Sequence, residues 1–299
     1  MEYYFRKTRI IVTEREIMLN VQGIIVPLLT PLATPETIDE AAARRLVDHV
    51  IAGGVRGIFI LGSTGEGPAL SGEAQRAFIR ICVDAVGGRV PLLAGISGAS
   101  AVDSTRLGKF AAEAGADAAV AAPPCYLPPD EDEQVAFYRY LAKEVPLPLF
   151  VYNMPSLTRV SLQLSALERI LAIPGVAGYK DSSGDLAAFR AVLEHFGSRP
   201  DLSLLVGPDE LTGEAVMLGA DGGVNGGANL NPRLFADLYE AAERKDAAKV
   251  AELQARVLEQ GKLYGTPVTT PGVIRAMKRE AARMGLCRNV LAVPALPLQ

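Results

Sequence analysis

Short apolar runs alternate with longer segments of helical periodicity along most of the chain. The runs are rich in aliphatic residues and apolar on both faces, which is typical of parallel strands covered by helices on both sides. The pattern predicts strands at residues 24–29, 57–61, 90–95, 118–122, 147–152, 176–180, 202–206 and 222–224. It predicts helices between them, at residues 39–52, 71–86, 101–114, 130–145 and 186–196.

Residues that favour helix ends agree with this assignment. Asn231-Pro232 is typical of an N-cap followed by proline at the first helical position. The acidic run 130–133 follows two prolines, and its charges would complement the partial positive charge of a helix N-terminus. These signals predict that one helix begins near residue 130 and another near residue 231.

Eight strand–helix units predict an α/β fold of the (β/α)8 TIM barrel type. After residue 243 the strands stop, and residues 246–260 and 272–285 have helical patterns. We therefore expect a barrel with the active site at residues 19–243 and a C-terminal helical domain at residues 244–299.

The first residues of the chain differ from the rest. Residues 1–18 mix charged and aromatic residues without an apolar core, so they do not resemble a secretory signal. Met18 offers a second start just before the first strand. We expect residues 1–18 to form a poorly ordered N-terminal extension.

An open doubly wound sheet is the alternative fold. It would need a glycine-rich dinucleotide turn after the first strand. The first strand instead leads into VPLLTP at residues 26–31, and the chain has no P-loop motif. The barrel is therefore favoured.

Composition and charge restrict the class of protein. Hydrophobic residues make up 49% of the 299 residues and charged residues 21%, as in a globular protein with a large core. The net charge of −4 gives no reason to expect nucleic acid or an anionic membrane as a partner. No apolar run is long enough to span a bilayer.

Cysteines and histidines give no sign of a metal site. Cys82, Cys125 and Cys287 lie far apart, which argues against a disulfide framework or a metal cluster and favours a cytoplasmic location. His49 and His195 fall in two different predicted helices. A zinc-dependent aldolase is therefore disfavoured.

Lys180 is the most informative candidate for chemistry. It ends the sixth predicted strand, within GVAGYKDSSG at residues 175–184. Burial disfavours the charged form of a lysine, and a neutral amine is ready to attack a carbonyl carbon. Because side chains alternate along a strand, Lys180 and Ser182 share one side, whereas Tyr179 and Asp181 face the other. We interpret Lys180 as a Schiff-base nucleophile; a strand-end lysine that reaches solvent is the alternative.

The loop after the second strand has the features of an anion site. It reads GSTGEG at residues 62–67. Glycines let the backbone approach a ligand closely, and successive N–H groups can form a nest for an anion. A carboxylate fits better than a phosphate, because the loop contains no Lys or Arg. An ordinary turn between strand and helix is the alternative.

Several more strand ends carry candidate side chains, and barrels of this type have their active sites at the C-terminal ends of the strands. Tyr152 ends the fifth strand, where its hydroxyl could relay a proton. Tyr126 lies in a loop stiffened by four prolines. Asp209 and Glu210 follow the seventh strand and could bind substrate hydroxyls. The alternative for each is structural. Tyr152 would make a structural hydrogen bond at the barrel rim, and Tyr126 would pack under its loop. The two carboxylates would cap the next helix.

Together these motifs resemble those of the dihydrodipicolinate synthase and N-acetylneuraminate lyase family of class I, pyruvate-dependent aldolases. The resemblance covers residues 21–294, and GSTGE at 62–66, YNMP at 152–155 and GYKDS at 178–182 occur in the family's order and spacing. It implies a (β/α)8 barrel with a C-terminal helical domain, usually assembled as a homotetramer of two dimers. It also implies no cofactor, because the substrate is held as a covalent imine.

The resemblance implies roles for the matching residues. Lys180 matches the lysine that forms an imine with the keto carbon of pyruvate, and Tyr152 matches the tyrosine that moves protons. Ser63 and Thr64 match the loop that binds the pyruvate carboxylate, with Thr64 in the proton relay. Tyr126 matches a tyrosine that reaches across a dimer interface. The remaining predicted substrate-binding residues are Gly62, Ser182, Gly207, Asp209, Glu210, Val224 and Leu157.

One position departs from the dihydrodipicolinate synthases of the family. They carry an arginine for the carboxylate of aspartate semialdehyde where this chain has Leu157, and a leucine cannot make that bidentate contact. Sugar-acid aldolases of the family tend to carry Leu-Thr here, as Leu157-Thr158 does. Arg159 lies two positions on and is a candidate substitute. The loop at 225–229 has glycine where sialic acid lyases have a hydroxyl, which argues against sialic acid.

The leading hypothesis is reversible aldol cleavage of a 2-keto-3-deoxy sugar acid, or a related 2-oxo acid, to pyruvate and an aldehyde. Within the family, the second hypothesis is a dihydrodipicolinate synthase that condenses pyruvate with aspartate semialdehyde. Two further hypotheses are a sugar-acid dehydratase, which would also work through an imine, and a non-catalytic sensor of 2-oxo acids.

Overall fold

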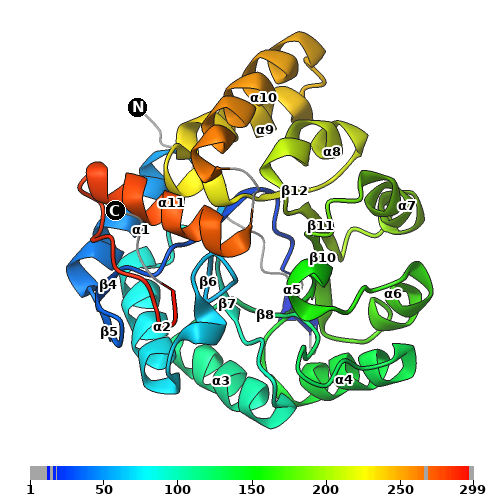
Figure 1. Cartoon of the computed structure of the whole chain (residues 1–299). Coiled ribbons are helices and arrows are strands. Elements are labelled where there is room, and N and C mark those ends of the chain that lie inside the picture. Colours follow the sequence, from blue (N-terminus) through cyan, green and yellow to red (C-terminus); the bar gives the residue numbers. More distant parts are fainter. Residues whose placement is uncertain (1–11, 14–15, 18, 266–268, 296–299) are drawn as a thin grey trace.

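Parallel strands close into a barrel, and helices surround it (Figure 1). The computed structural model describes residues 12–13, 16–17, 19–265 and 269–295. Around the barrel the strands follow one another in chain order, and the prediction of a (β/α)8 fold is confirmed. The strands are β3 (Gly23–Pro27), β6 (Gly57–Ile60), β7 (Leu92–Gly95), β8 (Ala118–Ala121), β9 (Leu149–Asn153), β10 (Val176–Asp181), β11 (Ser203–Val206) and β12 (Gly222–Val224).

The predicted strands overlap the observed ones, and no end differs by more than two residues. Two of the differences follow from proline. The predicted third and fifth strands include Pro91 and Pro148, whereas β7 and β9 begin directly after these residues. A proline has no N–H to donate to the ladder, so pairing starts one residue later.

Side chains cap the N-termini of five of the eight helices that surround the barrel. The ring of helices consists of α1 (Glu40–Ala52), α2 (Gly72–Val86), α3 (Ala101–Ala114), α4 (Glu131–Glu144), α6 (Leu164–Ile170), α7 (Leu186–Phe196), α8 (Thr212–Leu218) and α9 (Pro232–Glu243). Asp130 and Glu133 form a capping box at the start of α4, which confirms the predicted acidic start. Asn231 occupies the N-cap position of α9, but its side chain makes no capping hydrogen bond. The sequence pattern did not predict α6 and α8, which are too short for a clear helical period.

Further helices lie outside this ring. The one-turn helix α5 (Pro155–Thr158) follows β9, and α10 (Ala247–Gly261) and α11 (Thr270–Arg283) lie where C-terminal helices are predicted. Helix α10 packs against α9, and α11 contacts the loop after β6 through Lys278 and Glu66. That contact places α11 over the C-terminal ends of the strands, on the side that α5 also occupies (Figure 1). The division of the chain at residue 243 stays a prediction.

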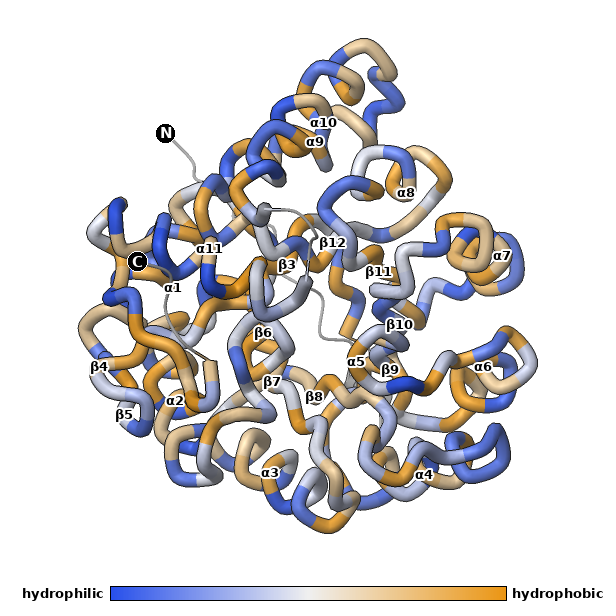
Figure 2. Tube along the Cα trace, in the orientation of Figure 1, coloured by the Kyte–Doolittle hydropathy of each residue, from blue (hydrophilic) through white to orange (hydrophobic). Residues whose placement is uncertain are grey.

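Apolar side chains fill the barrel and the space between strands and helices. Inside the barrel lie Ile25, Phe59, Leu93, Val120 and Phe150, each from a different strand. Larger apolar clusters lie outside, where strands meet helices. The strands are mostly hydrophobic except at the C-terminal ends of β9 and β10, whereas the outward faces of the helices carry many of the hydrophilic positions (Figure 2). The barrel is thus a packed core rather than a pore.

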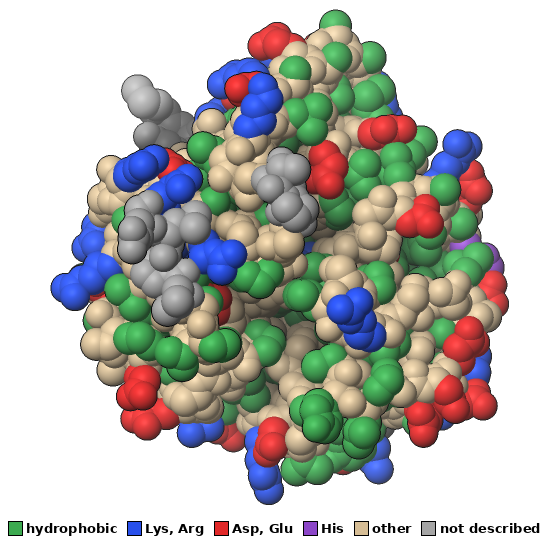
Figure 3. All heavy atoms as spheres, viewed as in Figure 1, with side chains coloured by type: hydrophobic (Ala, Val, Ile, Leu, Met, Phe, Trp, Pro, Cys, Tyr) green, Lys and Arg blue, Asp and Glu red, His purple; other side chains and the backbone are tan. Residues whose placement is uncertain are grey.

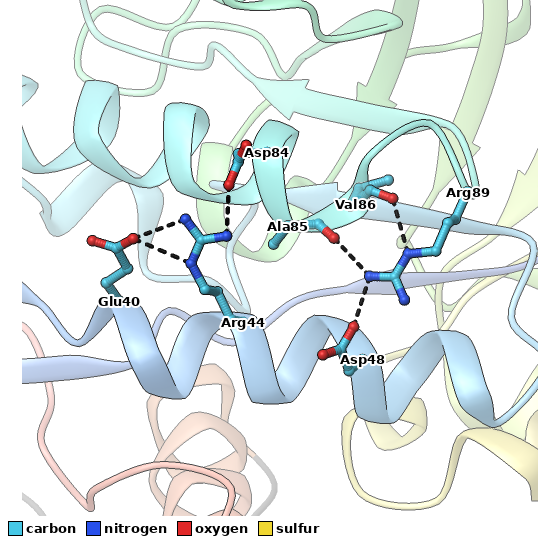
Figure 4. A network of polar contacts seen from close by, with 7 residues as sticks. All are labelled: Glu40, Arg44, Asp48, Asp84, Ala85, Val86 and Arg89. Atoms are coloured by element: carbon cyan, nitrogen blue, oxygen red, sulfur yellow. Dashed lines mark hydrogen bonds and ion pairs between the residues drawn. The ribbon is translucent and has the colours of Figure 1, made fainter.

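The face that carries the C-terminal strand ends is hollowed in the middle, between α11 and α5 (Figure 3). Charged side chains are more frequent toward the rim of this face (Figure 3). On the outside, α1 and α2 are joined by a polar network in which Arg44 bridges Glu40 and Asp84 and Arg89 binds Asp48 (Figure 4). These pairs are exposed and therefore contribute little to stability. Within the described ranges, no helix is both long enough and apolar enough to span a membrane.

The predicted N-terminal extension falls largely on residues outside the described part of the chain. Val12–Thr13 and Glu16–Ile17 form a short antiparallel pair, β1 and β2. A second antiparallel pair, β4 (Leu32–Thr34) and β5 (Thr37–Ile38), follows β3. The poor order expected of residues 1–18 stays a prediction.

Candidate active site

Lys180 points into the barrel from β10. Its side chain is only 5% exposed, and a cavity of about 10 Å³ beside it is lined by apolar side chains that include Phe150 and Val224. The Lys180 Nζ lies 3.9 Å from the ring centroid of Tyr152 and 5.2 Å from that of Phe59. Aromatic faces attract an ammonium, and the space around this amine is otherwise apolar. The arrangement holds one amine in a nearly water-free pocket at the strand ends.

The strand alternation predicts which neighbours face away from Lys180, and the structure agrees. Tyr179 packs in the outer core, stacked on Phe189. The buried Asp181 carboxylate accepts hydrogen bonds from Asn153 Nδ2 (2.8 Å), the Tyr179 hydroxyl (2.6 Å) and the Ser183 N–H (2.9 Å). Asp181 is therefore not the ion-pair partner of Lys180. The hydrogen bonds of Asp181 link the C-terminal ends of β9 and β10, where Lys180 and Tyr152 are paired across the two strands.

Tyr152 lies between Lys180 and the loop after β6. Its hydroxyl is 3.4 Å from the Ser63 hydroxyl oxygen. Burial by itself raises the pKa of the Tyr152 phenol, but the Lys180 charge and hydrogen bonds with Ser63, Ser182 and Lys180 act against burial, and the net pKa is lowered. A phenol with a lowered pKa gives up its proton more readily. Tyr152 can therefore act as a general base or acid beside the amine.

The loop at residues 62–67 is tightly bent by close backbone contacts. A Cβ on Gly67 would lie 2.0 Å from the Leu61 carbonyl oxygen, so only glycine fits there. Leu61 and Glu66 have φ values of 60° and 56°, in the left-handed region. The Gly65 carbonyl accepts a hydrogen bond of 2.5 Å from the Thr30 hydroxyl. The loop thus holds Ser63 next to Tyr152, whereas the Thr64 hydroxyl oxygen lies 3.8 Å from the position of a Cβ on Gly226.

A buried ion pair fixes the far end of this loop. Glu66 pairs with Lys278 of α11, whose side chain is 0% exposed. Lys278 also donates to the Val290 carbonyl (2.7 Å), and Glu66 accepts from the Ala292 N–H (2.9 Å). Burial lowers the pKa of Lys278, and Glu66 partly offsets this. The sequence interpretation missed the pair, although Lys278 stands four residues after the buried Ile274 and so lies on the apolar face of its helix.

The loop after β11 is built around Ser182 and the C-terminal helices. A Cβ on Gly207 would lie 2.0 Å from the Ser182 hydroxyl oxygen, so glycine is required where the two loops meet. The Asp209 carboxylate accepts from the Gly227 N–H at 2.9 Å, and burial raises the pKa of Asp209 to about 6. Glu210 is exposed. These bonds give Asp209 a structural role besides the predicted contact with substrate.

Tyr126 does not reach the site of its own chain. Its side chain is 85% exposed, and the neighbouring Leu127 is 80% exposed. Cys125 lines the cavity over Tyr152, whereas Tyr126 is not among the lining residues. Any contribution of Tyr126 to catalysis must therefore be made to another copy of the chain.

A cavity of about 470 Å³ opens above Tyr152 and Ser63, and we call it the main cavity. It is lined by the ends of β6 to β9 and by α5, which contributes Leu157 and Thr158. Leu157 is 43% exposed. Arg159 ends α5 with φ 60°, is exposed and is not among the residues that line the cavity. No charged side chain is among these lining residues either.

The described residues include no group of three or more His, Cys, Asp or Glu side chains that could hold a metal ion. The closed barrel, the buried lysine and the hydroxyl groups beside it are the parts of a class I aldolase, in which a lysine amine forms an imine with a keto substrate. A family model described as the dihydrodipicolinate synthetase family matches residues 20–299. The chain belongs to this family, whose members are carbon–carbon lyases that form a Schiff base with pyruvate.

Relatives of known sequence and structure agree over nearly the whole chain. A 4-hydroxy-tetrahydrodipicolinate synthase from Leptothrix cholodnii is 32% identical over 94% of both chains. The structure of dihydrodipicolinate synthase from Bacteroides thetaiotaomicron matches with a TM-score of 0.90 and 40% identity, covering 94% of this chain and 95% of the bacterial enzyme's chain. The Escherichia coli K12 prophage protein YagE, in complex with pyruvate, matches with a TM-score of 0.87 and 30% identity over 93% of each chain.

Proposed function

We propose that this enzyme catalyses the reversible aldol cleavage of a 2-keto-3-deoxy sugar acid, or of a related 2-oxo acid, to pyruvate and an uncharged aldehyde. The observation that carries the proposal is the position of the Lys180 amine, 3.9 Å from the centroid of the ring of Tyr152, which lines the uncharged main cavity. One amine, one phenol and a hydroxyl loop are the groups that this chemistry requires.

In the proposed reaction, the neutral Lys180 amine attacks the C2 carbonyl of the substrate, and water leaves as the imine forms. The Tyr152 phenol gives its proton to the imine nitrogen, which leaves an iminium beside a phenolate. The phenolate then takes the proton of the C4 hydroxyl. The C3–C4 bond then breaks, its electrons pass to the iminium nitrogen, and the aldehyde is released. Protonation of the resulting enamine at C3 and hydrolysis of the imine by water give pyruvate and the free amine. Every step can run in reverse.

Ser63, Thr64 and Ser182 have positioning roles in this proposal. Ser63 and Thr64 donate hydrogen bonds to the carboxylate next to C2, in a loop whose bent backbone is held by Gly67 and Glu66. Thr64 also passes protons to and from Tyr152. Ser182, held against Gly207, contacts the substrate from the opposite side of the barrel.

The sugar acid is favoured over aspartate semialdehyde by charge. A carboxylate on the aldehyde needs a cation near it, and Leu157 stands where dihydrodipicolinate synthases of the family carry an arginine. Arg159 is exposed and outside the lining of the main cavity. Dihydrodipicolinate synthase activity is the second candidate, because the Bacteroides thetaiotaomicron enzyme of that name is 40% identical over 94% of this chain.

Trapping the imine tests the proposal. Borohydride reduction in the presence of pyruvate is expected to add the mass of a pyruvate-derived group to Lys180, as located by peptide mass spectrometry. Lys180→Ala is the blank, and Lys143→Ala, at a lysine outside the site, is the matched control. A label on another lysine, or none, overturns the mechanism.

Substrate assays then separate the two activities. Release of pyruvate from 2-keto-3-deoxy acids, with no turnover of pyruvate plus aspartate semialdehyde, supports the sugar-acid aldolase. Turnover of aspartate semialdehyde that is lost in Arg159→Ala would instead identify a dihydrodipicolinate synthase in which Arg159 replaces the missing arginine.

We also propose a homotetramer of two dimers in the cytoplasm, with Tyr126 reaching the site of a neighbouring copy. The exposed Tyr126 and Leu127, and an apolar hollow beside them that includes Phe137 and Tyr140, support a contact between copies at this face. Sedimentation of Tyr126→Ala and Leu127→Asp variants tests the assembly. Loss of activity in Tyr126→Ala without dissociation would assign the tyrosine to the neighbouring site.

A further inference from the structure

A second cavity adjoins the main cavity and has no role in the chemistry described above. It has a volume of about 210 Å³, and we call it the side cavity. It lies among the loop after β6, helices α5 and α11, and the segment after α11, and its lining residues are Ser63, Glu66, Pro68, Ala69, Leu157, Thr270, Pro271, Ile274 and residues 291–295. Ser63, Pro68 and Leu157 line both cavities. The side cavity is therefore within reach of a molecule bound at Tyr152.

The walls of the side cavity are apolar. Ile274, Leu291 and Ala292 are buried there, and Leu157 is exposed at the boundary with the main cavity. The one charged lining residue is Glu66, and its carboxylate is occupied by Lys278 and the Ala292 N–H. A charged or strongly hydrated group would lose its water here without a partner in return. An apolar group would instead bring Leu157 and Ile274 out of contact with water.

The packing around Lys180 decides in which direction a substrate can extend. The space beside its amine measures only about 10 Å³ and is enclosed by side chains from all the barrel strands. Pyruvate held as an imine therefore cannot extend further into the barrel. The new carbon–carbon bond must point outward, toward the main cavity, and a longer aldehyde chain then meets Leu157 and the side cavity.

We propose that the side cavity is a subsite for the far end of the aldehyde, and that this end is apolar. This inference rests on the proposed aldolase function and chooses between its two substrate classes: the aldehyde is neutral and ends in an alkyl or aryl group, which favours a related 2-oxo acid over a sugar acid, whose aldehyde would end in a hydroxymethyl group. Leu157 is the residue that determines this specificity, because its exposed side chain lines both cavities.

The test measures pyruvate consumption with a series of unbranched aldehydes from acetaldehyde to hexanal, beside glyceraldehyde and succinic semialdehyde. Within the series, kcat/KM is expected to rise about fourfold for each methylene that enters the cavity, the factor that follows from burying one methylene. Leu157→Arg is expected to lower the ratio of the rates for hexanal and succinic semialdehyde at least tenfold. Leu258→Arg is the matched control, because Leu258 is exposed on α10 and lines neither cavity.

The outcomes separate this inference from the proposed function. If borohydride still labels Lys180 with pyruvate but kcat/KM does not rise with chain length, or glyceraldehyde or succinic semialdehyde is preferred, the subsite is refuted and the imine chemistry stands. An equal effect of Leu157→Arg and Leu258→Arg also refutes it. If no label forms, the proposed function fails first and the subsite fails with it.

Discussion

Lys278→Met tests the buried ion pair that joins α11 to the loop at residues 62–67. The substitution keeps the length and apolar part of the side chain but removes the ammonium. Glu66 then keeps only the Ala292 N–H as a partner, and the Val290 carbonyl loses its donor. Both side chains are buried, Lys278 at 0% exposure. Breaking such a pair by removing one partner costs about 3–5 kcal/mol, because a charge is left buried and uncompensated.

The assay is urea denaturation followed by circular dichroism, at a fixed protein concentration because assembly affects apparent stability. We expect the free energy of unfolding to fall by about 3–5 kcal/mol in Lys278→Met. Lys249→Met is the matched control on α10, where the lysine and its partner Glu252 are exposed, and it should cost under about 1 kcal/mol. Glu66→Gln combined with Lys278→Met should recover part of the loss, since the neutral amide can still accept from Ala292.

The same variant reports on the active site, because Glu66 belongs to the loop that holds Ser63 and Thr64. We expect KM for pyruvate to rise in Lys278→Met at temperatures where the protein is folded. Equal losses of stability in Lys278→Met and Lys249→Met, or a double variant less stable than Lys278→Met, would refute the reasoning about the buried charge.

Further predictions concern residues of the site. Tyr152→Phe should lower kcat by about 10²–10⁴-fold while borohydride still traps pyruvate, and an unchanged kcat would exclude Tyr152 as the proton-transfer group. Gly207→Ala should lower kcat/KM about 100-fold by displacing Ser182, whereas Gly261→Ala, where a Cβ meets nothing within 4 Å, should not. The pKa of Asp209 is about 6 in the folded protein, above its unfolded value, so its contribution to stability is present at low pH and is lost as the pH rises through 6. The Tm of Asp209→Asn should therefore rise relative to that of the parent protein between pH 4 and pH 7, and a parallel pH dependence of the two Tm values would contradict this.

The barrel could be predicted from the sequence because its signals are local. Parallel strands covered by helices have apolar runs of few residues, and amphipathic helices have a different period, so the alternation is visible without knowledge of contacts. The register around Lys180 was accessible for the same reason, since a period of two sends Asp181 to the opposite side. Short elements such as α5 do not show a period, and α5 carries Leu157.

The residues of the site that act through long-range contacts were not accessible from the sequence. Glu66 and Ala292 lie 226 positions apart, and no local pattern tells which distant backbone group a buried carboxylate will bind. The side cavity is likewise formed by a loop after the second barrel strand, a one-turn helix and the last described segment of the chain. The period of a segment indicates which face of that helix or strand is buried. Which two buried faces contact each other depends on how the barrel closes. The fold and the candidate Schiff-base lysine thus follow from local sequence, whereas the side chains that surround this lysine, and the cavities next to it, depend on tertiary contacts.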